Sequence, residues 1–192
     1  MIYHFTPFLR GDISEGINRS VAAVPDEAWV CIRDADTMFL TWRQQWQLEL
    51  ISKTTDYGLI GCMTNRCYPT YCMPGGKLSH DYDILHHVQI AKQLEVDNWC
   101  EVVPCPDGTN GSDEGIIYGQ FMMFPKKAWI DAGGYSGHVN HDIEFSRRIL
   151  NAGYKRGIAT GVYIFHAFRP GIEVPWFQSN FQDVARLDPE TA

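Results

Sequence analysis

An apolar run that ends abruptly at two carboxylates constrains the fold of this chain more than any other segment. Residues 29–32 read Trp-Val-Cys-Ile, and Arg33, Asp34, Ala35 and Asp36 follow directly. The run is typical of a buried strand, which places both carboxylates at one edge of a sheet. Two like charges at the lip of an apolar core repel each other unless a cation or a shared proton neutralises them. A solvated turn after the strand is the alternative interpretation, because Asp is common in turns.

Strand-like and helix-like segments alternate along the chain, which predicts an α/β fold. The apolar, strand-like runs cover residues 2–8, 29–32, 57–63, 99–103, 116–124 and 158–165. The helix-like segments cover residues 12–25, 41–53, 81–94 and 141–151, together with a short one that Pro125 opens. This order predicts an α/β/α sandwich with a mostly parallel central sheet, followed by a loop-rich tail over residues 170–192. Trp42 and Trp46 recur at near-helical spacing, so we expect their side chains in the core.

The composition predicts a single compact domain over residues 1–192. Its 45% hydrophobic and 20% charged content is ordinary for a globular protein. The formal net charge of −7 argues against a general surface for nucleic acids, which needs clustered Lys and Arg. Because no apolar run reaches the ~20 residues of a membrane span and the first residues lack the pattern of a signal peptide, we expect a cytoplasmic protein.

The six cysteines form no Cys-x-x-Cys pair, and several lie in apolar runs. We therefore expect reduced, partly buried thiols. The even spacing of Cys62, Cys67 and Cys72 leaves a zinc or disulfide cluster as the alternative.

The candidate metal ligands meet at one edge of the predicted sheet. In an open α/β sheet, ligands bind outside the carboxyl ends of the strands, where Asp34, Asp36 and His166 would all lie. Two carboxylates and an imidazole suit Mn²⁺ or Mg²⁺ together with substrate phosphates. Asp142 and Glu144 open a helix whose dipole stabilises their anions and presents one of them to the same cleft. The alternatives are a helix cap for Asp142 and a hydrogen-bonded strand-end histidine for His166.

An ordered set of motifs carries a family resemblance. It consists of residues 119–135 with a Gly-Gly-Tyr turn, residues 141–148 with His-Asp opening a helix that bears two arginines, and His166 closing a strand. This set resembles the catalytic half of GT-A glycosyltransferases of the family-2-like type. The acid pair at residues 34–36 looks like their Asp-x-Asp metal motif, and the match extends over residues 12–169.

The resemblance implies a Rossmann-like GT-A fold and metal-dependent, inverting transfer of a sugar from a UDP- or GDP-linked donor to an acceptor hydroxyl. Asp36 would bind the metal directly, Asp34 would contact the metal and the sugar or ribose, and His166 would complete the metal shell. Asp142 matches the general base of the family, but His141 replaces the acid that precedes it, so Glu144 is an alternative base. The residues expected to contact the donor are Thr6, Pro7, Arg10, Arg33, Asp34, Gly119 and Gln120.

The chain departs from the family in its first half, because relatives carry two further strand-helix units before the Asp-x-Asp strand. The nucleotide would therefore be held by residues 6–10 or with the help of another subunit in a homo-oligomer. Two other functions stay open: a degenerate sugar- or nucleotide-binding domain without catalysis, and a metal-dependent phosphoesterase. The acceptor classes to consider are a glycan, a protein and a modified nucleic acid.

Overall fold

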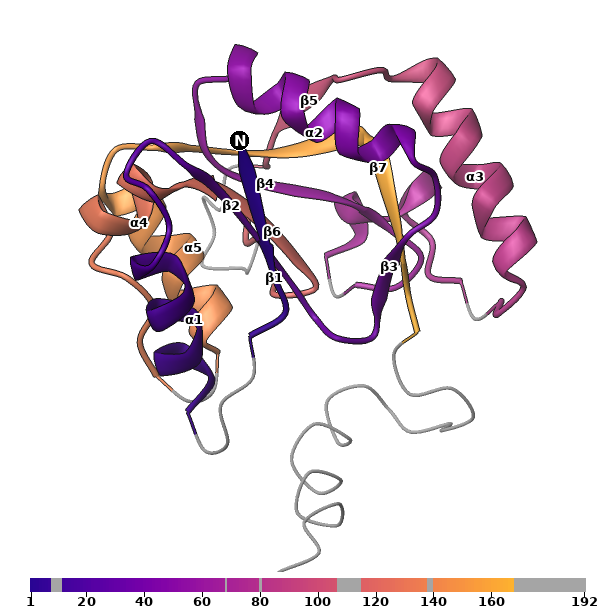
Figure 1. Ribbon diagram of the computed structural model, residues 1–192. Coiled ribbons are helices and arrows are strands. Elements are labelled where there is room, and N and C mark those ends of the chain that lie inside the picture. Colours follow the sequence, from indigo (N-terminus) through magenta and orange to yellow (C-terminus); the bar gives the residue numbers. More distant parts are fainter. Residues whose placement is uncertain (8–11, 68, 80, 107–114, 138–139, 168–192) are drawn as a thin grey trace, which may run out of the picture.

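The computed structural model describes residues 1–7, 12–67, 69–79, 81–106, 115–137 and 140–167 (Figure 1). Arg10 and the predicted tail lie outside these residues. The elements in chain order are β1 (Ile2–Phe5), α1 (Ile13–Ala22), β2 (Trp29–Arg33), β3 (Thr37–Phe39), α2 (Arg43–Thr54), β4 (Tyr57–Thr64), the short 3₁₀ helices η1 (Thr70–Cys72) and η2 (Pro74–Gly76), α3 (Ile84–Asp97), β5 (Val102–Pro104), β6 (Phe121–Pro125), α4 (Lys126–Asp131), α5 (His141–Asn151) and β7 (Lys155–His166).

The strands form one seven-stranded sheet in the order β1-β2-β6-β4-β7-β3, and β5 also pairs with β7. β4 lies along one side of β7, whereas β5 and β3 share its other side. The pairing of Thr37 in β3 with His166 in β7 places the chain that leaves β2 beside the end of β7. Residues that are far apart in the sequence therefore meet at one edge of the sheet.

Strand direction within the sheet is mixed. β1, β2, β4 and β7 run one way, and β3, β5 and β6 run the opposite way. The predicted α/β sandwich with a mostly parallel sheet is confirmed, since most strands share one direction; β1–β2 and β4–β7 are its parallel pairs. Because β6 runs opposite to β2, β4 and β7, it begins at the edge of the sheet where these three strands end.

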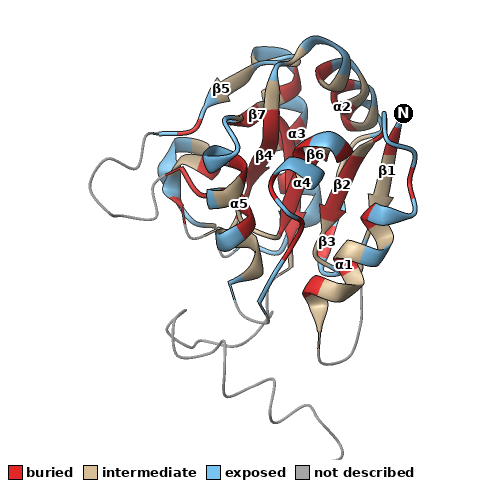
Figure 2. Cartoon of the chain, turned by 90° about the vertical axis from the view of Figure 1, so that its left-hand side faces the viewer, coloured by how far each residue is buried: buried red, intermediate tan, exposed pale blue. Residues whose placement is uncertain are grey.

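Helices cover both faces of the sheet (Figures 1 and 2). α1, α4 and α5 pack on one face, and α2 packs on the other. Along β2, Val30 and Ile32 face the first group, whereas Cys31 faces α2. The same alternation directs Arg33 toward the α2 side and Asp34 toward α1 and α5. No helix within the described ranges has the length and apolar character needed to cross a membrane.

Most predicted elements are present with shifted ends. Asp12 caps α1 as predicted, because its carboxylate accepts a hydrogen bond of 2.9 Å from the backbone amide of Glu15. Asp83, rather than Asp81, caps α3. β6 begins at Phe121 and not at residue 116, since a turn at residues 119–120 precedes it.

The prediction that Trp42 and Trp46 lie in the core is wrong. Their exposed fractions are 67% and 63%, and their rings meet edge to face with centroids 5.0 Å apart. Gln44 and Gln47, both fully buried, take inward positions on α2 instead.

An irregularity of β7 explains why glutamines, and not tryptophans, face the core on α2. The register between β4 and β7 shifts between Cys62 and Met63 of β4. In the corresponding part of β7, the Gln44 amide donates to the carbonyl of Tyr163 and the Gln47 amide donates to that of Gly161 at 3.0 Å. Buried carbonyls need hydrogen-bond partners. The buried face of α2 therefore requires glutamine side chains. The spacing of apolar residues in the sequence could not predict this.

Replacing Gln44 by leucine is expected to lower the free energy of unfolding by about 3 kcal/mol, because three backbone groups lose their partner in a buried place. Besides the carbonyl of Tyr163, these are the amides of Leu40 and Thr41, which donate to Gln44 Oε1 at 2.8 and 3.1 Å. The matched variant Trp46→Gln should cost less than about 1 kcal/mol, since it loses one exposed aromatic contact. Urea unfolding measures both, and equal losses would contradict this account of α2.

Candidate active site

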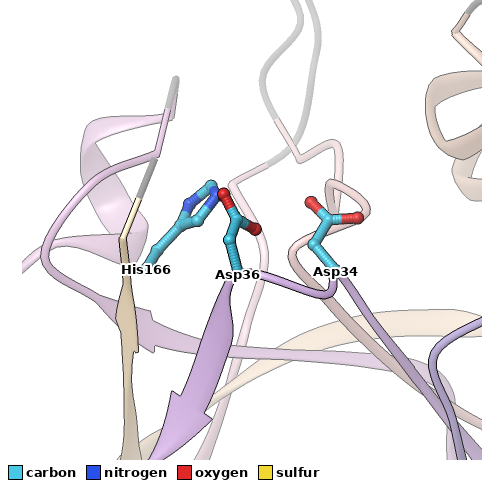
Figure 3. Close-up of side chains that lie close together, drawn as sticks. All are labelled: Asp34, Asp36 and His166. Atoms are coloured by element: carbon cyan, nitrogen blue, oxygen red, sulfur yellow. The ribbon is translucent and has the colours of Figure 1, made fainter. Parts of the chain in front are cut away.

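Asp34, Asp36 and His166 lie together at the carboxyl edge of the sheet, as the sequence predicts (Figure 3). Each offers one ligand atom, and these atoms all lie within 4.8 Å of one another. Asp34 follows β2, Asp36 precedes β3, and His166 ends β7. The pairing of β3 with β7 makes the cluster compact, because the amide of Ala167 donates to the carbonyl of Asp36 at 2.9 Å. The cluster therefore joins two parts of the chain 130 residues apart.

The orientation of the His166 ring suits metal ligation. Its Nδ1 lies 3.0 Å from the carbonyl oxygen of Arg66, which can only accept, so Nδ1 carries the hydrogen. Nε2 then points at Asp36 Oδ1 across 3.4 Å. A neutral ring brings the Nε2 lone pair against a carboxylate oxygen, and two acceptors at this distance need a proton or a cation between them. The donor set of two carboxylates and an imidazole thus fits a divalent ion such as Mn²⁺ or Mg²⁺.

Asn65 holds the backbone of His166, a role that the sequence analysis did not find. Its Oδ1 accepts from the His166 amide at 2.7 Å, and its Nδ2 donates to the His166 carbonyl at 3.1 Å. Only 2% of Asn65 is exposed. The signal was present in the sequence, since Asn65 is a polar residue directly after the apolar strand β4, in the same relation as Asp34 to β2.

The charges of the site are unbalanced toward the negative. Desolvation, together with the carboxylates of Asp36 and Asp142, raises the pKa of Asp34 to about 6 against the opposing effect of His166. Burial disfavours the charged form of His166, but the hydrogen bond and the charge of Asp36 outweigh it, so its pKa lies above the ordinary value. Both groups therefore hold protons more strongly than they do in water, which is the behaviour expected of clustered groups that can bind a cation.

Affinity for Mn²⁺ is expected to fall as the pH is lowered from about 7.5 to about 5.5, by up to about tenfold per pH unit for each proton displaced. The sign follows from the raised pKa values, because Asp34, whose pKa is about 6, becomes protonated over this range, the raised pKa of His166 favours its protonated form, and a protonated group cannot ligate. Calorimetric titration with Mn²⁺ at several pH values measures the effect. A dissociation constant that is independent of pH would show that these two groups do not hold the ion.

Asp142 borders the same site, whereas Glu144 faces away from it. Asp142 Oδ2 accepts from the Gly119 amide at 2.9 Å, and Oδ1 accepts from the Ile143 amide at 2.8 Å. A methyl group on Gly119 would lie 3.4 Å from Asp142 Oδ2 and 3.8 Å from Asp34 Oδ1, so both carboxylates adjoin this glycine. Glu144 is exposed and pairs with Arg147 at 3.3 Å on the solvent side of α5.

A cavity of about 210 Å³ adjoins the metal ligands on the α1 and α5 side of the sheet. It brings together five of the predicted donor-contacting residues with His141, which replaces the expected acid. The five are Thr6, Pro7, Arg33, Asp34 and Gly119. Desolvation lowers the pKa of His141, while the charge of Asp142 acts in the opposite direction. This side of the cavity is therefore lined by a predominantly neutral imidazole at neutral pH.

The polar ends of two predicted donor-contacting side chains lie elsewhere. Arg33 is among the residues that line the cavity, but its guanidinium lies over the ring of Phe39, 4.6 Å from its centroid, on the α2 side of the sheet. Gln120, next to Gly119, is buried, and its amide donates to Cys67 Sγ at 2.9 Å. The sequence could not separate these residues from their neighbours, because the alternation of β2 and the turn before β6 decide their directions.

No protein-family model matches the sequence, and no curated protein shows significant similarity to it. Among solved structures, the chain is similar to a mannosyltransferase from Pyrobaculum calidifontis in complex with GDP-mannose and Mn²⁺, with a TM-score of 0.50 and 16% sequence identity. The similarity covers 84% of this chain and 37% of the mannosyltransferase, so the chain spans well under half of that protein. The likeness concerns the fold, which is a mixed α/β fold of the kind found in that glycosyltransferase.

Proposed function

We propose that this chain is a divalent-metal-dependent glycosyltransferase that uses a nucleotide-diphosphate sugar. The observation that carries the proposal is the convergence of Asp34, Asp36 and His166 within 4.8 Å beside a cavity that Asp34 itself lines. The similarity in fold to an enzyme solved with GDP-mannose and Mn²⁺ supports the same class. A nucleotide-diphosphate sugar offers both an anionic group for such a metal site and a body for the cavity.

In this proposal Asp34, Asp36 and His166 hold Mn²⁺ or Mg²⁺. When bound, the ion supplies positive charge that stabilises the diphosphate as it leaves. The chain contributes the orientation of the ligands: the Arg66 carbonyl fixes the His166 tautomer, and Asn65 fixes the backbone that carries the ring. Thr6 and Pro7 at the end of β1 line the donor side of the cavity.

Asp142 is the general base of the proposed reaction. Each of its carboxylate oxygens accepts one backbone amide, so each keeps a lone pair for a further hydrogen bond. One of them takes the proton of the acceptor hydroxyl while the hydroxyl oxygen forms its bond to the anomeric carbon and the bond from that carbon to the diphosphate breaks. A single displacement of this kind inverts the anomeric configuration. The two backbone amides hold the carboxylate in place.

Calorimetric titration with a panel of UDP- and GDP-linked sugars tests the proposal, first with Mn²⁺ and then with a chelator. GDP-mannose is the first donor to test, because the structurally similar enzyme was solved with it. We expect one donor to bind in a metal-dependent manner and its sugar to appear on an acceptor. Metal-dependent binding without transfer to any acceptor would favour a non-catalytic binding domain. Binding of no donor would contradict the proposed function.

A further inference from the structure

A second cavity, of about 570 Å³, lies between the start of α2 and α3, separate from the cavity beside the metal ligands. Half of its lining residues are apolar and half are polar. The residues are Leu40, Trp42, Val88 and Val96, and Thr41, Arg43, Lys92 and Glu95. A cavity of this size with apolar walls and a few polar groups is typical of a site for a small molecule or for part of a larger one.

The side chain of Trp42 forms an aromatic wall of this cavity. Although its exposed fraction is 67%, two neighbours hold the ring. The ring of Trp46 meets it edge to face with centroids 5.0 Å apart, and the Arg43 guanidinium lies 5.7 Å from its centroid. An aromatic ring that is already ordered loses little conformational freedom when a ligand covers it. Trp42 therefore offers an open and ordered apolar surface.

A nearly buried carboxylate lines the same cavity. Glu95 is 5% exposed, and its Oε1 accepts from the hydroxyl of Thr41, which joins α3 to the segment before α2. Among the described residues this hydroxyl is the hydrogen-bond partner of the carboxylate. A carboxylate has about four acceptor positions, so most of them are left for donors from a ligand. The cavity thus combines an aromatic surface with a buried hydrogen-bond acceptor.

We propose that this cavity, called the α2–α3 site, binds a carbohydrate chain. A pyranose ring presents a face of C–H groups, which stacks on an aromatic ring, and hydroxyl groups at its edge. Trp42 suits the face, Glu95 accepts from the hydroxyls, and Lys92 at the rim donates to their oxygens. An apolar protein segment would cover Trp42 but leave the buried carboxylate without donors, which is costly. The lining therefore favours a glycan over a protein partner.

The place of the α2–α3 site suits a chain that also reaches the metal ligands, and this part of the inference rests on the proposed function. Asp36 and Leu40 flank the two ends of β3. At about 3.3 Å per residue, the strand separates them by roughly 13 Å. Holding an acceptor glycan at this site raises its effective concentration at the metal ligands. Binding of the glycan itself needs neither metal nor donor, so it does not rest on the proposed function.

Calorimetric titration with mannohexaose, cellohexaose and maltohexaose, in the presence of a chelator and without a donor, tests the site. We expect at least one probe to bind with a Kd below about 1 mM. Trp42→Ala should weaken binding by at least about tenfold, and Glu95→Gln by about tenfold. Trp46→Ala should weaken it less, because Trp46 only supports the Trp42 ring. Trp99→Ala is the matched control, since Trp99 is also exposed but is not among the lining residues, and it should bind like the wild type.

Absence of binding to all three probes would overturn the proposed site, as would wild-type affinity in Trp42→Ala or Glu95→Gln. Sedimentation of the wild type and Trp42→Ala tests a second copy as the occupant: a wild-type dimer that becomes a monomer in the variant would assign this face to an interface between copies and overturn the proposal.

The role in holding an acceptor has its own measurement. With the bound probe as acceptor, Trp42→Ala should raise the KM for the probe at least about tenfold without changing kcat. An unchanged KM would overturn this role. Binding of a probe by a protein that transfers no sugar would support the α2–α3 site and count against the proposed function.

Discussion

An Asp36→Ala variant is expected to lose Mn²⁺ affinity and sugar transfer by more than about 100-fold, with little change in the free energy of unfolding. Asp36 is the ligand whose position the fold determines most closely. It immediately precedes β3, its carbonyl accepts from Ala167, and its carboxylate faces His166 Nε2 at 3.4 Å. Because its side chain is exposed, truncation leaves no cavity in the core. The losses in metal binding and in turnover should therefore appear in a folded protein.

Two comparisons make the Asp36 result specific. Asp36→Asn keeps the size of the side chain but removes its charge, so it should lose most of the affinity as well. Glu27→Gln removes an exposed carboxylate after α1 and should behave like the wild type. Calorimetry with Mn²⁺ and a donor-turnover assay measure all three variants. Wild-type turnover by Asp36→Ala would contradict the assignment of Asp36 as a metal ligand.

Asp142→Asn is expected to lower the rate of transfer by about 10²- to 10⁴-fold while leaving donor and Mn²⁺ binding nearly unchanged. The asparagine retains an oxygen that can accept the Gly119 amide, but it cannot take a proton from the acceptor hydroxyl. The effect should therefore appear in the rate of the chemical step. A rate assay at saturating donor, together with calorimetry, separates the two quantities.

Glu144→Gln is the matched control for Asp142→Asn, because both residues lie in the first turn of α5 and both are candidate bases in the sequence. Glu144 is exposed and paired with Arg147, so its replacement should change the rate by less than about threefold, the equivalent of a surface contact. The opposite pattern, with a slow Glu144→Gln and an active Asp142→Asn, would transfer the proposed role to Glu144.

The cluster of Asp34, Asp36 and His166 could be predicted because its position depends mainly on where two strands end. An apolar run followed by carboxylates indicates where β2 stops, and a histidine after a second apolar run indicates the end of β7. Any sheet in which these two strands run in the same direction brings their ends to one edge. The cluster was therefore expected before the order of the strands was known, and the intervening β6 and β4 did not alter it.

The choice between Asp142 and Glu144 could not be made from the sequence, because both residues stand in the same helical turn and the direction of each depends on how α5 packs. In the structure the Gly119 amide donates to Asp142 Oδ2, which places Asp142 beside the candidate site, whereas Glu144 pairs with Arg147 on the solvent side of α5. That amide lies at the site only because β6 is antiparallel to its neighbours and begins at this edge. A parallel β6 would have placed the turn at the opposite end of the sheet.

The sequence by itself determined the local features of this protein: the alternating elements, the cap of α1 and the strand ends that carry the metal ligands. These depend on periodicity and on residues within a few positions of one another. Only the tertiary structure decided the direction of β6 and the inward glutamines of α2. Each of these depends on a partner distant in the sequence or on an irregular turn of the chain, and a backbone carbonyl becomes buried only once the sheet has formed.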